Sequence, residues 1–120
     1  MRETKKTNQN LAQLITQLRA ASHEHGAPIW RDIAKRLDKP RRNWAEVNVS
    51  RIARFAKENE ILVVPGKLLA TGDISVPVTV APYRSSRAAE EKIEKAGGRV
   101  ITIQQLVAEV PKGTSVRIMG

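Results

Sequence analysis

The apolar residues of this chain change their spacing near residue 44, and this change limits the folds that the chain can adopt. Before residue 44 they recur every three or four residues, as on one face of an α-helix. After it they alternate with polar residues or form short apolar blocks, as in strands. We therefore predict a helical N-terminal part followed by alternating strands and helices, which is an α/β fold. A length of 120 residues favours one domain with one modest core.

Proline and glycine mark the ends of the two predicted N-terminal helices. The first helix is expected to begin near residue 8, after a basic tail, and to end at Gly26. Pro28 stands at the first position of the second helix, where its missing N–H costs nothing, and that helix is expected to end before Pro40. The predicted organisation is thus a basic N-terminal tail (1–7) and a single globular domain (8–120), which comprises a helical pair (8–38) and an α/β part (44–120).

Strands and helices alternate in the predicted α/β part. The expected strands cover residues 45–49, 61–64, 76–80, 100–103 and 116–118, and the expected helices cover residues 51–57, 86–96 and 102–110. Ser50 is expected to cap the first of these helices, with Phe55 turned inward. Pro65 and Gly66 are expected to end the second strand.

The composition excludes several classes of function. The chain has no cysteine, so it has no disulfide, thiol nucleophile or sulfur-ligated metal site, and this suits a reducing cytosol. Its N-terminal residues lack the apolar run of a signal peptide, and no apolar stretch is long enough to span a membrane. Only 3% of the residues are aromatic, so the core must be built from aliphatic side chains and few rings are left to stack on bases.

Positive charge is concentrated in residues 35–57. This stretch holds eight basic residues and two acidic ones, a net charge of +6, whereas the whole chain carries +9. Charge of one sign repels itself in a folded chain, and a polyanion relieves that repulsion. Nucleic-acid phosphates attract Lys and Arg through the release of condensed counterions. We therefore predict that this stretch binds nucleic acid.

The turn at residues 39–44 is expected to be the centre of the binding surface. Pro40 stiffens this turn, so its cations project at a lower entropic cost. Asn43 can bond a phosphate or a base edge, and Trp44 either stacks on a sugar or base or belongs to the core. The cations of the N-terminal tail form a second basic element, which can become ordered on RNA.

Three short motifs do not complete a catalytic or metal site. Residues 65–67 resemble part of a phosphate-binding loop, but the residues around them do not match the rest of that motif. His23 and His25 point in different directions on a helix and lack a third ligand. The glutamates within residues 90–94 alternate with basic residues, as on a solvated helix face. We expect no catalytic residue, no metal, no cofactor and no small-molecule substrate.

Two rival classes of function are considered. Residues 28–38 and 50–57 could form the helix-turn-helix of a sequence-specific DNA-binding regulator, although the eleven residues between them exceed the usual three- or four-residue turn. An enzyme of RNA metabolism would need a cleft in which titratable groups converge, and the sequence offers none. The DNA-binding regulator is therefore the alternative to a binder of RNA.

Several segments of the chain carry a family resemblance. They are TNQNL at residues 7–11, IWRDIAKRL at 29–37, KPRR and AEVNVSRI within 39–52, VVPGKLLATG and VTVA within 63–81, the helical spacing of Ser86, Ala89, Ile93 and Gly97, and GTSVRI at 113–118. Together they resemble the large-subunit ribosomal protein eighteen family of archaea and eukaryotes, a relative of bacterial large-subunit ribosomal protein fifteen. The resemblance covers essentially the whole chain, although Ala70 and the pair Tyr83-Arg84 depart from the usual family pattern.

This resemblance implies a fold, a role and partners. It implies an irregular superhelix of strand–strand–helix units preceded by two helices, and a structural, non-catalytic role in the large subunit of cytoplasmic ribosomes. The implied partners are large-subunit ribosomal RNA and neighbouring large-subunit ribosomal proteins. On this reading, the residues expected to bind RNA are Arg2, Lys5, Lys6, Lys35, Lys39, Arg41, Arg42, Asn43, Trp44, Asn48, Arg51, Arg54 and Lys67.

Overall fold

A computed structural model describes residues 2–120 of the chain, with side chains described from Asn10 onward. Two helices come first, α1 (Arg2–His25) and α2 (Pro28–Leu37). The elements that follow are η1 (Arg41–Asn43, a 3-10 helix), β1 (Ala45–Asn48), α3 (Val49–Phe55), β2 (Ile61–Leu69), β3 (Thr79–Ser85), α4 (Arg87–Lys95), β4 (Arg99–Val100), α5 (Ile103–Glu109) and β5 (Val116–Ile118). The predicted α/β class, with two helices ahead of the strand–helix units, is confirmed.

The boundary between α1 and α2 lies where the sequence predicted it. Gly26 has a φ of +61°, in the left-handed region that glycine adopts without strain, and Pro28 occupies the start of α2. The start of α1 differs from the prediction: the helix begins at Arg2 rather than near residue 8. The Lys and Glu residues before residue 8 are good helix formers and do not interrupt the helix. The predicted division into tail and domain stays a prediction.

Strand β2 lies at the centre of a parallel sheet. One edge of β2 pairs with β3, and the other edge is shared by β5, which pairs with residues 61–63, and by β1, which pairs with residues 66–69. Pro65 lies between these two stretches, where the register to β3 also shifts, so its missing N–H interrupts no ladder. The prediction that Pro65 and Gly66 end this strand is therefore wrong.

Gly66 permits the close approach of β1. It pairs with Ala45 in the register of the two strands, and a Cβ at position 66 would collide with the Ala45 carbonyl group. Because β1 follows directly on the basic turn, this contact fixes the position of the turn relative to the sheet.

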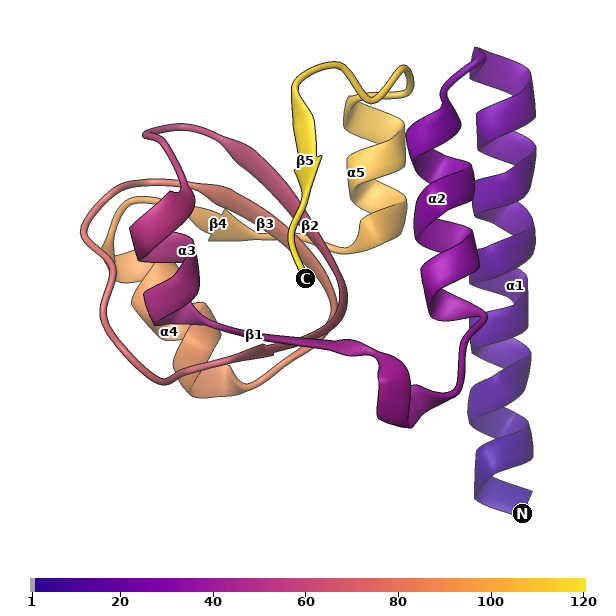
Figure 1. The fold of residues 1–120 in the computed structure, drawn as a ribbon, viewed down its shortest axis with the longest axis horizontal. Coiled ribbons are helices and arrows are strands. Elements are labelled where there is room, and N and C mark those ends of the chain that lie inside the picture. Colours follow the sequence, from indigo (N-terminus) through magenta and orange to yellow (C-terminus); the bar gives the residue numbers. More distant parts are fainter. Residues whose placement is uncertain (1) are drawn as a thin grey trace.

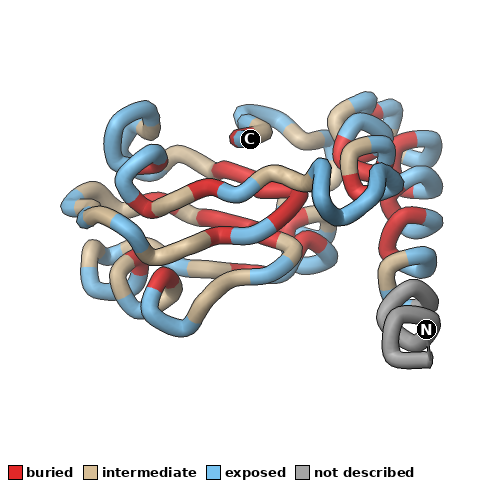
Figure 2. The backbone as a smooth tube through the Cα atoms, turned by 60° about the horizontal axis from the view of Figure 1, so that its bottom comes forward, coloured by how far each residue is buried: buried red, intermediate tan, exposed pale blue. Residues whose placement is uncertain are grey.

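Helices cover both faces of the sheet (Figure 1): α3 and α4 lie on one face, and α1, α2 and α5 lie on the other. Neighbouring residues of β2 point to opposite sides, so Val63 belongs to the cluster beneath α1, α2 and α5, whereas Leu62 and Val64 belong to the cluster beneath α3 and α4. Figure 2 shows buried positions (red) along the middle of the layered segments and alternating with exposed positions along the N-terminal helix.

Helix α3 differs from its prediction in two respects. Asn48, not Ser50, is the residue before the helix, and the Ser50 backbone N–H donates to the Thr71 carbonyl oxygen at 3.0 Å. Phe55 was expected to face inward, but 52% of its surface is exposed. The helix ends at Phe55 because Ala56 has an extended backbone, and Val49 and Ile52 already fill the core beneath it.

Two strands also differ from their predicted bounds: β3 starts and ends later than predicted, and β4 is shorter. Strand β3 begins at Thr79 rather than residue 76, and the Pro77 carbonyl instead accepts from the Asn59 backbone N–H at 2.6 Å. Strand β4 contains only Arg99 and Val100. Proline has no N–H to donate to a ladder, which explains why the strand starts after Pro77.

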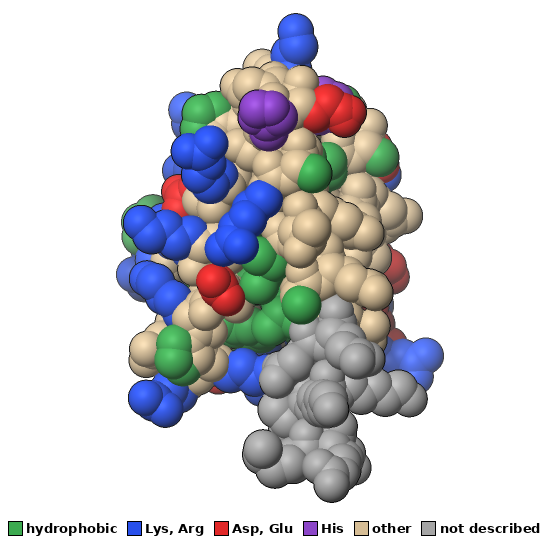
Figure 3. Space-filling view, turned by 90° about the vertical axis from the view of Figure 1, so that its right-hand side faces the viewer, with side chains coloured by type: hydrophobic (Ala, Val, Ile, Leu, Met, Phe, Trp, Pro, Cys, Tyr) green, Lys and Arg blue, Asp and Glu red, His purple; other side chains and the backbone are tan. Residues whose placement is uncertain are grey.

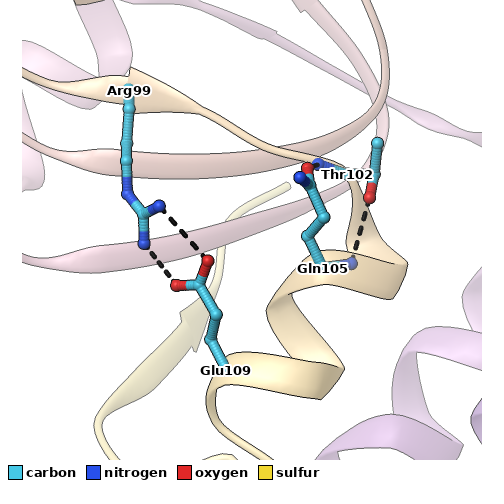
Figure 4. Close-up of polar contacts among 4 residues, drawn as sticks. All are labelled: Arg99, Thr102, Gln105 and Glu109. Carbon is cyan, nitrogen blue, oxygen red and sulfur yellow. Dashed lines mark hydrogen bonds and ion pairs between the residues drawn. The ribbon is translucent and has the colours of Figure 1, made fainter.

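Helix α5 is fixed at both ends by side chains (Figure 4). The Thr102 hydroxyl accepts from the Gln105 backbone N–H at 3.0 Å, and the Gln105 side chain accepts from the Thr102 backbone N–H at 2.8 Å, which forms a capping box. Glu109 forms an ion pair with Arg99 of β4. The hydrogen bond and the negative charge of Glu109 raise the pKa of Arg99 above its ordinary value.

Replacing Thr102 with alanine is expected to lower the free energy of unfolding by about 1 kcal/mol, because the Gln105 backbone N–H in the first turn of α5 loses its side-chain acceptor. Thr102→Ser is the matched control, since it keeps the hydroxyl and should retain most of that stability. Urea unfolding of the three proteins checks this. Equal losses in both variants would show that the methyl group, rather than the cap, stabilises the helix.

Candidate nucleic-acid interface

The structure divides the predicted cations of residues 35–57 into two groups. Lys35 and Lys39 lie on and just after α2, and Arg41 and Arg42 lie in η1, whereas Arg51 and Arg54 lie on α3. Strand β1 joins the groups and spans about 13 Å. Because α2 and α3 pack on opposite faces of the sheet, the cations border it from both sides.

These predicted cations differ from several other cations of the chain in their ion pairing. Arg19, Arg36, Lys92, Arg99 and Arg117 each lie within 4.0 Å of a carboxylate oxygen, for example Arg117 and Glu60 at 3.0 Å. Among the side chains described from residue 10 onward, no carboxylate lies within that distance of the predicted RNA-binding cations. These are Lys35, Lys39, Arg41, Arg42, Arg51, Arg54 and Lys67, and all are exposed. Their charge is therefore available to an external anion.

Figure 3 shows how Lys and Arg side chains gather along one side of the face that α1 presents. Two ion pairs lie on α1 and α2 or just after α2: Arg19–Asp38 at 3.3 Å and Arg36–Asp32 at 3.2 Å. They neutralise part of the charge of α1 and α2, whereas Lys39, Arg41 and Arg42 of the turn that follows have no carboxylate within 4.0 Å among the described side chains.

Trp44 holds the turn in place. Its ring packs against the edge of the Tyr83 ring, with centroids 5.1 Å apart, and its indole N–H donates to the Lys39 carbonyl oxygen at 3.0 Å. The Arg41 guanidinium lies over the Trp44 ring, 5.7 Å from its centroid. Trp44 is half-buried against the core cluster of α1, α2 and α5, so it supports the turn and is only partly a core residue.

Lys67 and Arg84 extend the cationic turn onto the sheet. Lys67 of β2 aligns with Glu46 of β1 on one side and with Arg84 of β3 on the other, and aligned residues of neighbouring strands share a face. A pocket of about 130 Å³ lies between them, lined by Arg41, Trp44, Ala45, Glu46, Lys67 and Arg84. We call it the Trp44 pocket. Its three cations outnumber its one carboxylate.

Arg84 lies in the candidate interface, although the sequence pattern did not predict it there. Its guanidinium lies over the Tyr83 ring, 5.9 Å from the centroid, and it too lacks a carboxylate within 4.0 Å among the described side chains. The pair Tyr83-Arg84 was visible as a departure from the family pattern. Its meaning depends on the register between β2 and β3, which places Arg84 beside Lys67.

Other predicted residues have different surroundings. The Asn48 side-chain oxygen accepts from the Thr71 backbone N–H at 3.3 Å, so this residue ties the start of α3 to the loop after β2. Asn43 is exposed in η1. The side chains of Arg2, Lys5 and Lys6 lie outside the described residues.

The described residues offer little to other chemistries. From residue 10 onward, His, Asp and Glu side chains do not gather in groups of three or more that could hold a metal ion. Within residues 2–120, no helix combines the length and the apolar character needed to cross a bilayer.

Comparisons with known proteins extend over the whole chain. The model of the family described as "Ribosomal protein 60S L18 and 50S L18e" matches residues 1–120. The Large ribosomal subunit protein eL18 of Methanococcus maripaludis is 46% identical over 120 residues, which is 100% of both chains. Its namesake in Archaeoglobus fulgidus is 50% identical over 115 residues, covering 96% of this chain and 98% of the relative. That of Methanospirillum hungatei is 49% identical over 118 residues, or 98% of each chain.

Proposed function

The chain belongs to the family of ribosomal proteins 60S L18 and 50S L18e, and from this membership we propose that it is a structural, non-catalytic constituent of the large subunit of cytoplasmic ribosomes. Its partners are large-subunit ribosomal RNA and neighbouring ribosomal proteins. It binds the RNA through the exposed cations of α2, η1, α3 and the Trp44 pocket.

The observation that carries this proposal is the concentration of exposed cations without carboxylate partners, among the described side chains, on α2, η1, α3 and the Trp44 pocket. Five other cations, including Arg36 of α2, have carboxylate partners, whereas the predicted RNA-binding cations with described side chains have none within 4.0 Å among those residues. A phosphate that binds such a cation displaces no internal ion pair and releases condensed counterions. Exposed positive charge without internal partners is what a polyanion-binding surface requires.

The turn after α2 is held in a form that lowers the cost of binding. The Asn43 backbone N–H donates to the Pro40 carbonyl oxygen at 2.8 Å, and the Trp44 indole donates to Lys39. The side chain of Arg41 is already aligned on Trp44. Because these contacts restrict the turn before RNA arrives, less conformational entropy is lost on binding.

The DNA-binding alternative is not supported by the fold. A helix-turn-helix needs two helices that pack together across a turn of three or four residues. Here η1 and β1 separate α2 from α3, and the two helices belong to different core clusters. Neither helix is therefore presented as the second helix of such a motif.

The salt dependence of RNA binding tests the proposal. We expect the logarithm of the affinity for large-subunit ribosomal RNA to fall linearly with the logarithm of salt concentration. If the eight unpaired cations named above, with Arg84 included, each contact one phosphate, the slope is about −6 to −7. Filter binding between 50 and 200 mM salt measures it, with duplex DNA of the same length as the control. An affinity that is independent of salt, or equal for the DNA, would contradict the proposal.

A further inference from the structure

Phe55 is the one large hydrophobic side chain that is exposed among those described from residue 10 onward, with 52% of its surface accessible. The chain has only four aromatic residues. Of the others, Trp30 is fully buried, and Trp44 and Tyr83 pack against each other. A single exposed hydrophobic residue is common on protein surfaces, so its meaning depends on its surroundings.

The backbone at Phe55 is held by a residue distant in sequence. The Arg117 guanidinium, from β5, donates to the Phe55 carbonyl oxygen at 2.7 Å and to the Glu60 carboxylate at 3.0 Å. Glu60 also accepts from the Lys57 backbone N–H at 2.9 Å. These contacts anchor the end of α3 from two directions, so the ring projects from a fixed point on the surface.

One cation without a carboxylate partner among the described side chains lies over this ring, and two more are close to it in sequence. The Arg54 guanidinium lies over it, 5.9 Å from its centroid. Arg51 and Lys57 are exposed close by in sequence, and none of the three has a carboxylate within 4.0 Å among the described side chains. An apolar protein surface placed here would bury cations without partners, which is costly. RNA offers phosphates to the cations and a flat base to the ring.

We propose that Phe55 stacks on an unpaired base of ribosomal RNA while Arg51 and Arg54 bind the phosphates that flank it. This inference rests on the proposed function, because it names the RNA element that the α3 side of the interface recognises. An unpaired base is required, since a base within a duplex already stacks on its neighbours and presents only its edge.

Two measurements on the same variants separate stacking from charge. Phe55→Ala is expected to weaken binding to large-subunit ribosomal RNA about 5- to 150-fold, because one base–aromatic stack is lost, and to leave the slope of log affinity against log salt unchanged. Phe55→Trp should restore the affinity, whereas Phe55→Leu, which is apolar without a π-face, should not. Arg54→Ala should reduce the steepness of the salt slope by about 0.7 to 0.9.

Each other outcome overturns the inference in a distinguishable way. If Phe55→Ala and Phe55→Leu bind like the unchanged protein while Arg54→Ala binds more weakly, Phe55 does not stack, and RNA binding by the cations stands. If Phe55→Ala binds free RNA normally but is lost from assembled large subunits, the ring contacts a neighbouring protein instead. If the unchanged protein does not bind the RNA, the proposed function itself fails. Thermal unfolding of each variant verifies its fold, which an exposed side chain should not affect.

Discussion

Replacing Arg41, Lys67 and Arg84 together with alanine is expected to reduce the affinity for large-subunit ribosomal RNA by about two orders of magnitude at 0.1 M salt, and the salt slope by about 2 to 3. The physical reason is that the Trp44 pocket brings these three cations together with only one carboxylate, Glu46. Each phosphate contact that disappears leaves a set of counterions bound to the RNA. Filter binding over a range of salt concentrations measures both quantities.

A matched control removes the same charge from another part of the surface. Arg87, Lys95 and Lys112 are exposed and have no carboxylate within 4.0 Å among the described side chains. They lie on α4 and in the loop before β5, and none of them lines the pocket. Their triple alanine variant should bind with nearly unchanged affinity. If both triple variants lose affinity equally, the overall charge of the protein, rather than the pocket, governs binding.

Trp30→Ala is expected to lower the free energy of unfolding by about 3 to 5 kcal/mol. Trp30 of α2 is fully buried in the core cluster that α2 shares with α1 and α5. Its indole N–H donates to the Pro111 carbonyl oxygen at 2.7 Å. Alanine leaves a cavity and an acceptor without its donor. Since domains are commonly stable by only about 5 to 15 kcal/mol, the variant should be close to unfolding at physiological temperature. Urea unfolding monitored by circular dichroism measures the loss.

Two further tryptophan variants identify the cause. Trp30→Phe keeps much of the volume but removes the donor, so a smaller loss of about 1 to 3 kcal/mol is expected. Trp44→Ala should also cost less than Trp30→Ala, because Trp44 is only half-buried. If Trp30→Ala and Trp44→Ala lose the same free energy of unfolding, the burial of each ring does not determine how much it contributes to stability.

Several features of the interface could be predicted from the sequence because charged side chains are rarely buried. The cations of residues 35–57 were expected to be accessible to solvent. All of them are exposed except Arg36, which is partly buried and ion-paired. What the pattern could not predict was their division between the two faces of a sheet. A run of basic residues contains no information on where the chain turns between them.

The sequence could not decide, for a similar reason, whether Trp44 belongs to the core or to the binding surface. An indole can be buried or can contact a partner, and only the packing of Tyr83 and Arg41 against it defines its surroundings. Phe55 was predicted to be buried from helical spacing, but α3 ends at that residue and the ring lies outside the core.

The amino-acid sequence by itself determined the class of fold, the boundary at Gly26 and Pro28, the position of α5 and the basic character of the surface. Each of these depends on interactions within a few residues, or on solvation of single side chains. Only the tertiary structure decided that β2 continues through Pro65, that Arg84 lies beside Lys67, and that Arg117 anchors Phe55. These depend on which strands become neighbours and in what register, and the contacts that select them join residues that are tens of positions apart.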